Sequence, residues 1–201
     1  MARLQLSKSA LSREQKNLRT YKRFLPSLDL KRQQVMAERN KAARQLAQTR
    51  REIDALRKAA GDINPMLANR DVELTDLARI TDVRLDVENV VGTRLPTLTT
   101  VIVEVRDYPL MGKPFWVDIT ARMLRQMLEL RVRLQVEERR LALLEQAVKT
   151  ITQRVNLFDK VLIPRARQNI KRIQIYLSDL QTAAVVRSKI AKRKRAAMEA
   201  V

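Results

Sequence analysis

The sequence of 201 residues contains no cysteine and no histidine, and it has only three glycines and 3% aromatic residues. Without cysteine and histidine there are no disulfide bonds, no thiolate or imidazole metal sites, and no Ser–His or Cys–His nucleophilic pair. The three glycines, Gly61, Gly92 and Gly112, stand alone, so they cannot form a glycine-rich phosphate-binding loop. The sequence therefore predicts a protein that is not an enzyme by itself and holds no cofactor or metal.

Long apolar runs are also missing. No stretch of about 18 apolar residues is present, so no transmembrane segment is expected. Residues 1–20 lack the apolar core of a secretion signal, so export of the protein is not expected.

Acidic residues offer two weaker candidates for chemistry. An oxygen-ligand metal site at Asp82, Asp86 and Glu88 competes with an ordinary strand surface, and the strand surface is favoured. Glu137 and Glu138 are adjacent on a predicted helix, so their side chains point about 100° apart. A solvated helix face is favoured for this pair over general acid–base catalysis.

The net charge of +19 is concentrated at the two ends of the chain. Residues 1–50 hold 13 Lys and Arg against 3 Asp and Glu, which gives +10, and residues 150–201 hold 12 against 3, which gives +9. Residues 51–149 hold 16 of each and are neutral. If the two ends fold side by side, one tip of the molecule is strongly basic.

Few glycines and abundant Ala, Leu, Glu, Arg and Lys indicate long helices. From Leu18 to Ala60 mostly apolar residues recur at alternating three- and four-residue steps, which is typical of a coiled coil. Ser9 or Ser12 is expected to cap this helix. Pro26 predicts a kink or a helix start near Leu25.

A second helix is expected from residue 117 to about Arg195, capped by Asp118 or Thr120. A large apolar residue recurs there at every seventh position from Met127 to Leu162, so the helix must wrap around a partner. Beyond Pro164 this repeat steps by four, as in a stutter, and the proline predicts a bend.

The central residues have a different composition. Gly61, Asn64 and Pro65 end the first helix, and residues 66–81 could form a short amphipathic helix. Residues 83–105 contain two segments rich in β-branched residues, separated by residues 92–96, and predict a β-hairpin. A turn-rich connection over residues 106–116 follows.

The predicted fold is mostly α: a long antiparallel two-helix coiled coil formed by the N- and C-terminal helices, with a central insert that contains a short β-hairpin. The predicted divisions are residues 1–60, 61–116 and 117–201. The predicted seam between the helices comprises Leu18, Leu25, Leu28, Val35, Leu46, Ile53, Met127, Leu134, Leu141, Val148, Val155, Leu162, Ile173 and Leu177.

The basic tail has three interpretations: a solvated helix end, a set of phosphate contacts for nucleic acid, or a tip inserted into a socket of another protein. The absence of aromatic stacking residues nearby disfavours nucleic acid, and the pairing of both basic ends favours the socket. The candidate partner-binding residues are Arg187, Lys189, Lys192, Arg193, Lys194, Arg195, Arg3, Lys8, Val90, Gly92 and Pro96.

Short motifs in three regions resemble those of the D subunit of V-type (vacuolar/archaeal-type) ATPases. Residues 154–156, 163–165 and 187–189, with the apolar positions between them, are similar to the C-terminal signature of that family. Residues 28–32 resemble a segment of its first helix, and residues 89–92 with 95–96 resemble its central region. The matches occur in the family's order and cover most of the chain.

This resemblance implies a non-catalytic rotor shaft that transmits torque between ATP hydrolysis or synthesis and ion movement. The implied partners are the catalytic and non-catalytic subunits of the ATPase ring, the F subunit, and the adaptor protein on the membrane ring, with no direct nucleotide contact. The implied location is cytoplasmic and peripherally membrane-associated through the complex. Two alternatives remain: a nucleic-acid-associated basic coiled coil, or the stalk of a related export ATPase.

Overall fold

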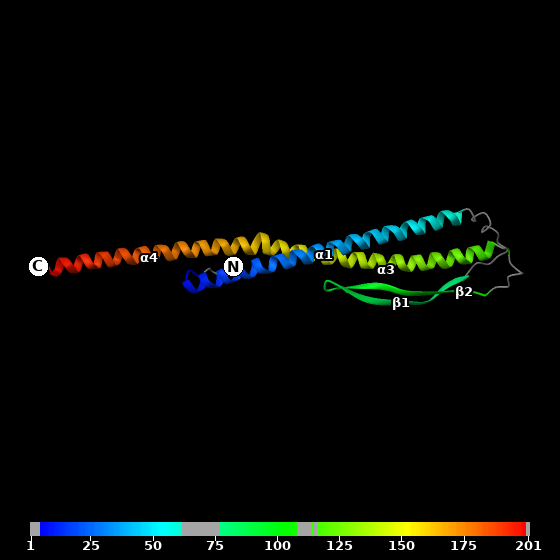
Figure 1. Ribbon diagram of the computed structural model, residues 1–201, viewed down its shortest axis with the longest axis horizontal. Helices are drawn as coiled ribbons and strands as arrows, with labels where there is room; N and C mark the ends of the chain where they lie inside the picture. The colour runs from blue at the N-terminus through cyan, green and yellow to red at the C-terminus, as the bar shows by residue number, and fades with distance from the viewer. Residues whose placement is uncertain (1–4, 62–76, 108–113, 115, 200–201) are drawn as a thin grey trace. The chain divides into compact units, whose positions relative to one another are not determined.

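The computed structural model describes residues 5–61, 77–107, 114 and 116–199. Along the chain, its elements are helix α1 (Lys8–Gly61), strands β1 (Ala78–Val90) and β2 (Thr93–Val105), helix α3 (Trp116–Asn156), the π-helix η2 (Leu157–Leu162) and helix α4 (Ile163–Glu199) (Figure 1). The predicted mostly helical fold with a central hairpin is confirmed. Residues 66–76 of the short helix expected at 66–81 lie outside the described residues, and residues 78–81 belong to β1.

These segments pack into two units. Unit 1 contains residues 1–30 with residues 151–201, and unit 2 contains residues 31–150. The long helices contribute to both units, whereas the hairpin lies wholly in unit 2.

Helix α1 begins at Lys8, before either of the caps that the sequence indicated. The Ser7 hydroxyl accepts a hydrogen bond from the Ala10 backbone N–H at 3.2 Å, so Ser7 is the cap and the expectation of Ser9 or Ser12 is wrong. The helix also continues through Pro26, so no helix starts near Leu25.

In unit 1 the first part of α1 runs antiparallel to η2 and the first part of α4. The rings of Tyr21 and Phe158 meet edge to face, with centroids 5.6 Å apart. Further toward the N-terminus of α1, Glu14 accepts a hydrogen bond from the Asn169 side-chain amide at 3.4 Å. Because the residue number falls in α1 while it rises in the partner, the two segments are antiparallel.

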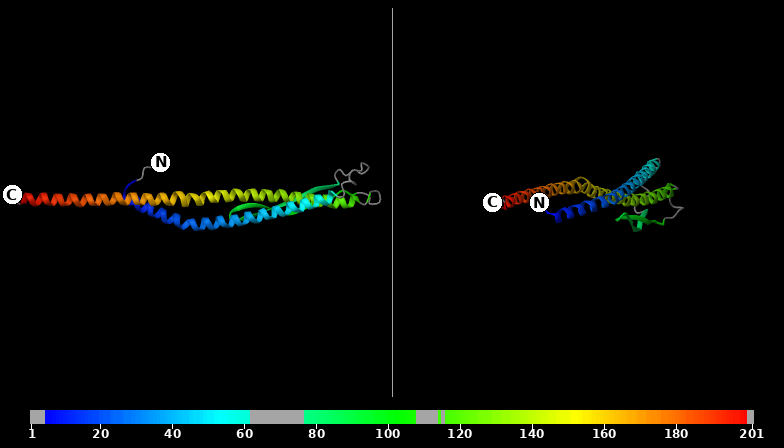
Figure 2. Two further views of the ribbon diagram at one scale, coloured as in Figure 1. Left: turned by 90° about the horizontal axis from the view of Figure 1, so that it is seen from above. Right: turned by 60° about the vertical axis from the view of Figure 1, so that its left-hand side comes forward.

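Unit 2 shows the same direction of pairing between the second half of α1 and α3. Val35 and Ala42 pack in one buried cluster with Leu144, and Arg50 forms an ion pair with Glu138 at 2.9 Å. Higher numbers in α1 again meet lower numbers in α3. The two views of Figure 2 show these segments of α1 and α3 lying side by side.

Burial along the helices follows the apolar periodicity. Among the predicted seam residues, Val35, Leu46, Ile53, Val155 and Ile173 are buried, and the remainder are partly buried: Leu18, Leu25, Leu28, Met127, Leu134, Leu141, Val148, Leu162 and Leu177. The sequence pattern missed Leu144 and Ile151, which are buried three residues after Leu141 and Val148. A seven-residue step selects only one of the two positions that a heptad buries.

The irregularity expected near Pro164 is a π-helix. In η2 the Ile163 backbone N–H bonds to the Phe158 carbonyl, five residues back. Proline lacks an N–H, and its ring clashes with the carbonyl four residues earlier, so a wider turn just before Pro164 accommodates it. The extra residue in the turn accounts for the four-residue step of the apolar repeat.

The hairpin is longer than predicted because β1 begins at Ala78 and β2 already begins at Thr93. Val91 and Gly92 form a two-residue turn with positive φ at both positions, 53° and 85°. The Asn89 side-chain oxygen accepts the Gly92 N–H at 3.0 Å. Pro96, which was assigned to the connection between the strands, lies within β2 opposite Val87.

Both ends of the hairpin are anchored on the helices of unit 2. Near the turn, the fully buried Leu95 packs with Val35 and Leu144. At the open end, Leu77 and Val105 belong to a cluster with Trp116, Val117 and Ala121 at the start of α3. The hairpin therefore runs alongside α3, as Figure 1 shows.

The start of α3 differs from its predicted caps. Thr120 lies inside the helix, where its buried hydroxyl donates to the Trp116 carbonyl at 2.9 Å, so Thr120 is not the cap. Asp118 lies in the first turn, where a carboxylate is favoured by the helix dipole.

Candidate interaction surfaces

The C-terminal part of α4 is a helix without a packing partner among the described residues. Its last buried residue is Ile173, and beyond Leu177 only Ala183 is even partly buried up to residue 196. Large apolar side chains stay exposed here, including Val185, Val186 and Ile190. A helix without tertiary packing is only marginally stable in water, and exposed apolar side chains mark interaction sites. This segment is therefore suited to packing against another protein.

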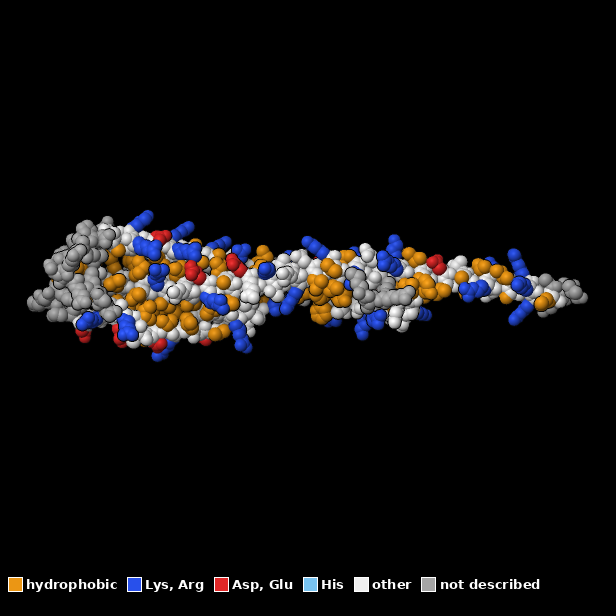
Figure 3. All heavy atoms as spheres, turned by 180° about the vertical axis from the view of Figure 1, so that it is seen from behind, with side chains coloured by type: hydrophobic (Ala, Val, Ile, Leu, Met, Phe, Trp, Pro, Cys, Tyr) orange, Lys and Arg blue, Asp and Glu red, His pale blue; other side chains and the backbone are white. Residues whose placement is uncertain are grey.

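The six basic candidates of the tail all lie on this exposed part of α4: Arg187, Lys189, Lys192, Arg193, Lys194 and Arg195. Figure 3 shows Lys and Arg side chains projecting from this end of the helix, with apolar side chains between them. We call this segment, residues 180–195, the α4 tip.

The other basic terminus does not reach the α4 tip. Asn169 lies opposite Glu14, and α1 begins six residues before Glu14, at Lys8, or about 9 Å along the helix. Arg187 lies 18 residues beyond Asn169, or about 27 Å. Lys8 is exposed, and Arg3 lies outside the described residues. The described tip therefore consists of α4 alone, whereas the sequence suggested that both termini would form it.

The three candidates of the hairpin differ in accessibility. Val90 is partly buried against the cluster of Val35 and Leu95, so it serves the core. Gly92 is exposed at the turn, and Pro96 is partly buried on β2.

Arg140 of α3 fastens the hairpin to the helices, and sequence analysis did not single it out. Its guanidinium donates to the Glu88 carboxylate of β1 at 2.7 Å and to the Thr97 hydroxyl of β2 at 2.9 Å. The Arg140 side chain is only 17% exposed, so its end of this ion pair is shielded from solvent, whereas the Glu88 side chain is 53% exposed. Nothing in the sequence separates Arg140 from the neighbouring arginines on α3.

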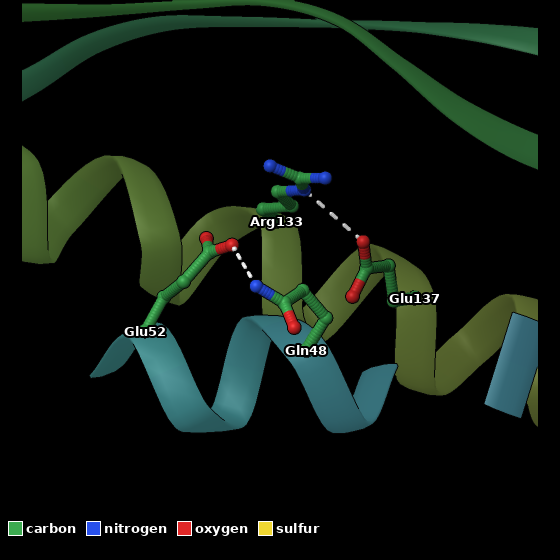
Figure 4. Close-up of polar contacts among 4 residues, drawn as sticks. All are labelled: Gln48, Glu52, Arg133 and Glu137. Atoms are coloured by element: carbon green, nitrogen blue, oxygen red, sulfur yellow. Dashed lines mark hydrogen bonds and ion pairs between the residues drawn. The ribbon is translucent and has the colours of Figure 1, made fainter. Parts of the chain in front are cut away.

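The acidic residues considered for chemistry all have structural partners. Glu137 is paired with Arg133 on the same helix at 3.1 Å, whereas Glu138 is paired with Arg50 on α1. Figure 4 shows the pair of Arg133 and Glu137 on α3, and below it Gln48 and Glu52 extending from α1 toward α3, where Gln48 donates to Glu52. The two adjacent carboxylates thus enter separate ion pairs.

The acidic residues of β1 are similarly engaged. Asp82 is paired with Arg84, Glu88 with Arg140, and Asp86 accepts the Val87 N–H. Within the described ranges, no group of three acidic residues is arranged to hold a metal ion. No helix in the described part of the chain is long and apolar enough to cross a membrane.

An open groove of about 890 Å³ lies between α1, β2 and α3 in unit 2. Its walls are largely apolar, with Leu56, Leu98 and Leu130 among them, while Glu52 and Arg133 add charge. Together with the α4 tip, it is a surface suited to a macromolecular partner.

The paired helices, the anchored hairpin and the exposed basic tip define a helical protein that presents surfaces to other chains. The family of ATP synthase D subunits matches residues 10–193, and the chain belongs to this family. The resemblance to the D subunit seen in the short motifs is thereby confirmed.

Relatives from bacteria extend over nearly the whole chain. The D subunit of the V-type ATP synthase of Borreliella burgdorferi is 33% identical over 192 residues, which cover 96% of this chain and 95% of the relative. The proteins of the same name from Chlamydia muridarum and Chlamydia caviae are 31% and 29% identical, each over 96% of this chain and over 96% and 94% of the relative.

Proposed function

We propose that this chain is the non-catalytic central rotor shaft of a V/A-type rotary ATPase. In this role it transmits torque between the catalytic ring and the ion-translocating ring of the membrane. Its membership of the family of ATP synthase D subunits supports a place in such a complex. The observation that carries the proposal is the α4 tip, an exposed helix end with six cations and unburied apolar side chains.

The α4 tip suits insertion into a ring of other subunits. Inside a ring, Val185, Val186 and Ile190 would lose their contact with water, and burial of apolar area is favourable. The cations would meet acidic or carbonyl groups of the ring and steer the encounter. The catalytic and non-catalytic ring subunits are therefore the proposed partners of this segment.

Torque needs a shaft that resists twisting. In both units an antiparallel helix pair buries an apolar seam, and close packing transmits strain because protein interiors compress little. The fully buried Leu144 and Ile173 mark such packing in unit 2 and unit 1. The groove and the hairpin of unit 2 are the proposed contacts for the F subunit and the membrane-ring adaptor. Attachment to the membrane would then be peripheral, on the cytoplasmic side.

The test removes the basic part of the α4 tip, from Arg187 onward, from the assembled complex. Truncation after Val186 deletes all six cations, and truncation after Ala196 is the matched control that keeps them. We expect the shorter chain to lower the ratio of ions pumped to ATP hydrolysed, because torque is no longer delivered, while the control leaves the ratio unchanged. Equal ratios in both variants would contradict the proposal.

A nucleic-acid-binding role is the second candidate, and the exposed basic run favours it. It predicts binding of the isolated chain to duplex DNA that weakens steeply with salt. If the chain is not retained on DNA at low salt, this candidate is eliminated. The third candidate is the stalk of a related export ATPase. This candidate is disfavoured because such a stalk has less need for the hairpin.

A further inference from the structure

The hairpin has one face that is apolar from its open end as far as Val87 and Pro96. Residues paired across antiparallel strands share a face, and alternate residues of a strand share it too. By register, this face carries the pairs Ile80–Val103, Val83–Val101, Leu85–Leu98 and Val87–Pro96. The opposite face is mainly polar.

This apolar face passes from the interior to the surface. At the open end Val103 is only 7% exposed, whereas toward the turn Leu85 is 55% and Val87 is 62% exposed. Strands twist, and the two register shifts in this hairpin increase the twist. At the turn end the other face, with Leu95, contacts the helices. The apolar face is therefore turned away from the helices at that end.

The exposed end of this face forms an apolar strip of Leu85 and Val87 on β1 with Leu98 and Pro96 opposite them on β2. Figure 3 shows apolar side chains gathered over the region where the hairpin lies. Leu85 and Val87 are exposed, and Pro96 and Leu98 opposite them are partly buried, with Leu98 also bordering the groove of unit 2. Exposed apolar side chains on a sheet face that no other described element covers indicate an interaction site.

The strand edges beside the strip are not suited to adding another strand. In a hairpin with a two-residue turn, the backbone groups of Val87 and Pro96 point to the outer edges. Pro96 has no N–H, and the N–H of Val87 is already bound by the Asp86 carboxylate at 2.7 Å. Neither edge therefore offers a free backbone donor at the pair of Val87 and Pro96, which disfavours a partner strand that runs past this pair.

The turn end of the strip is positively charged. Arg94 is exposed and shares the face of Pro96, two residues away. The Lys31 ammonium of α1 lies 3.4 Å from where a Cβ on Gly92 would be. These cations favour an acidic partner, and the net charge of +19 disfavours a second copy of this chain.

We propose that the apolar strip binds an amphipathic helix of another protein in the complex, with a carboxylate of that helix directed toward Arg94 and Lys31. Along a strand the two pairs of the strip lie about 7 Å apart. Residues four apart on a helix rise by about 6 Å, so one helical turn covers both pairs. This proposal rests on the proposed function in one respect: the partner is expected to be a subunit of the rotary ATPase.

The test places a photoreactive benzophenone side chain at position 87 of the full chain in the purified, assembled ATPase. After irradiation, the cross-linked peptides are identified by mass spectrometry. The expected product joins position 87 to one segment of a different protein of the complex, with apolar residues three and four apart and an Asp or Glu at one end. Cross-links to a second copy, to lipid, to a segment without that pattern, or to nothing would overturn the proposal.

Charge and surface variants separate this contact from general misfolding. Arg94→Glu should lower the cross-linking yield about fivefold, since about 1 kcal/mol corresponds to that ratio, while Arg51→Glu on the exposed side of α1 should not. When the probe is at position 85 instead, Val87→Thr should lower the yield, and Ile102→Thr on the opposite hairpin face should not. Equal effects of variant and control would contradict the proposal.

The result can be distinguished from a failure of the rotor assignment. If the chain does not assemble with the ATPase subunits, the proposed function fails before any cross-link is scored. If the complex forms and pumps ions but position 87 gives no cross-link to a helix, only the inference about the hairpin is wrong.

Discussion

Replacing Leu144 with alanine tests how unit 2 is held together. Leu144 is fully buried where α1, α3 and the hairpin meet, in one cluster with Val35, Ala42 and Leu95. Truncating such a leucine removes its transfer free energy and leaves a cavity, which costs about 2–5 kcal/mol. With a urea dependence of about 1.5 kcal/mol per molar for a unit of this size, the unfolding midpoint should fall by about 1 to 3 M.

Tryptophan fluorescence is the suitable assay because the chain has a single tryptophan. Trp116 is buried in the other cluster of unit 2, so its emission reports unfolding of that unit without direct contact with the Leu144 site. The control is Met36→Ala, a truncation at an α1 residue of the same unit that is 40% exposed, and it should cost less than about 1 kcal/mol. Equal midpoints for the two variants would refute the three-way core.

Three further changes probe other contacts. Arg140→Ala should speed amide hydrogen exchange in the hairpin through loss of about 1–3 kcal/mol, whereas Arg139→Ala, at an exposed neighbour, should leave exchange unchanged. Gly92→Ala places a side chain at φ +85° and should lower the melting temperature by several degrees, but Gly61→Ala, which meets nothing within 4 Å, should not. Val148→Asp buries a charge beside the core of unit 2 and should unfold the helix pair or uncouple the motor; unchanged melting and coupling would refute the seam.

Much of the fold follows from periodicity in the sequence. Apolar steps of three and four residues identify the helices, and because each helix needs a partner, antiparallel pairing of the two ends was predictable. Gly92 and the β-branched residues on both sides of it identify the hairpin, although the turn is formed by Val91 and Gly92 instead of residues 92–96, and β1 begins five residues before the predicted start at Val83. The family was also predictable, because its motifs are local.

The missed features depend on tertiary contacts or on competing local rules. Pro96 was taken as a break because proline interrupts most strands, yet at an outward-facing edge position it removes no hydrogen bond from the ladder. Pro26 was expected to kink or begin a helix, yet α1 runs from Lys8 to Gly61 with Pro26 inside it. The contacts of Arg140 with β1 and β2 join residues that are 52 and 43 positions apart, respectively, which no local pattern encodes.

The interaction surfaces were only partly predictable. The six cations of the α4 tip are visible in the composition, but their distance from Lys8 depends on which residues of the two helices are opposite each other. For Leu85 and Val87 the sequence predicted only a place in the hairpin, not which side of it is exposed. Only the twist and the two register shifts turn their face outward.

The most direct test of the shaft is rotation of this chain within the ring. Because the chain has no cysteine, Lys58→Cys on the exposed side of α1 gives a unique attachment point for a bead. With the catalytic subunits fixed to a surface, ATP should drive the bead in one direction in discrete steps. A bead that stays fixed relative to the ring while the same complexes hydrolyse ATP would contradict the account.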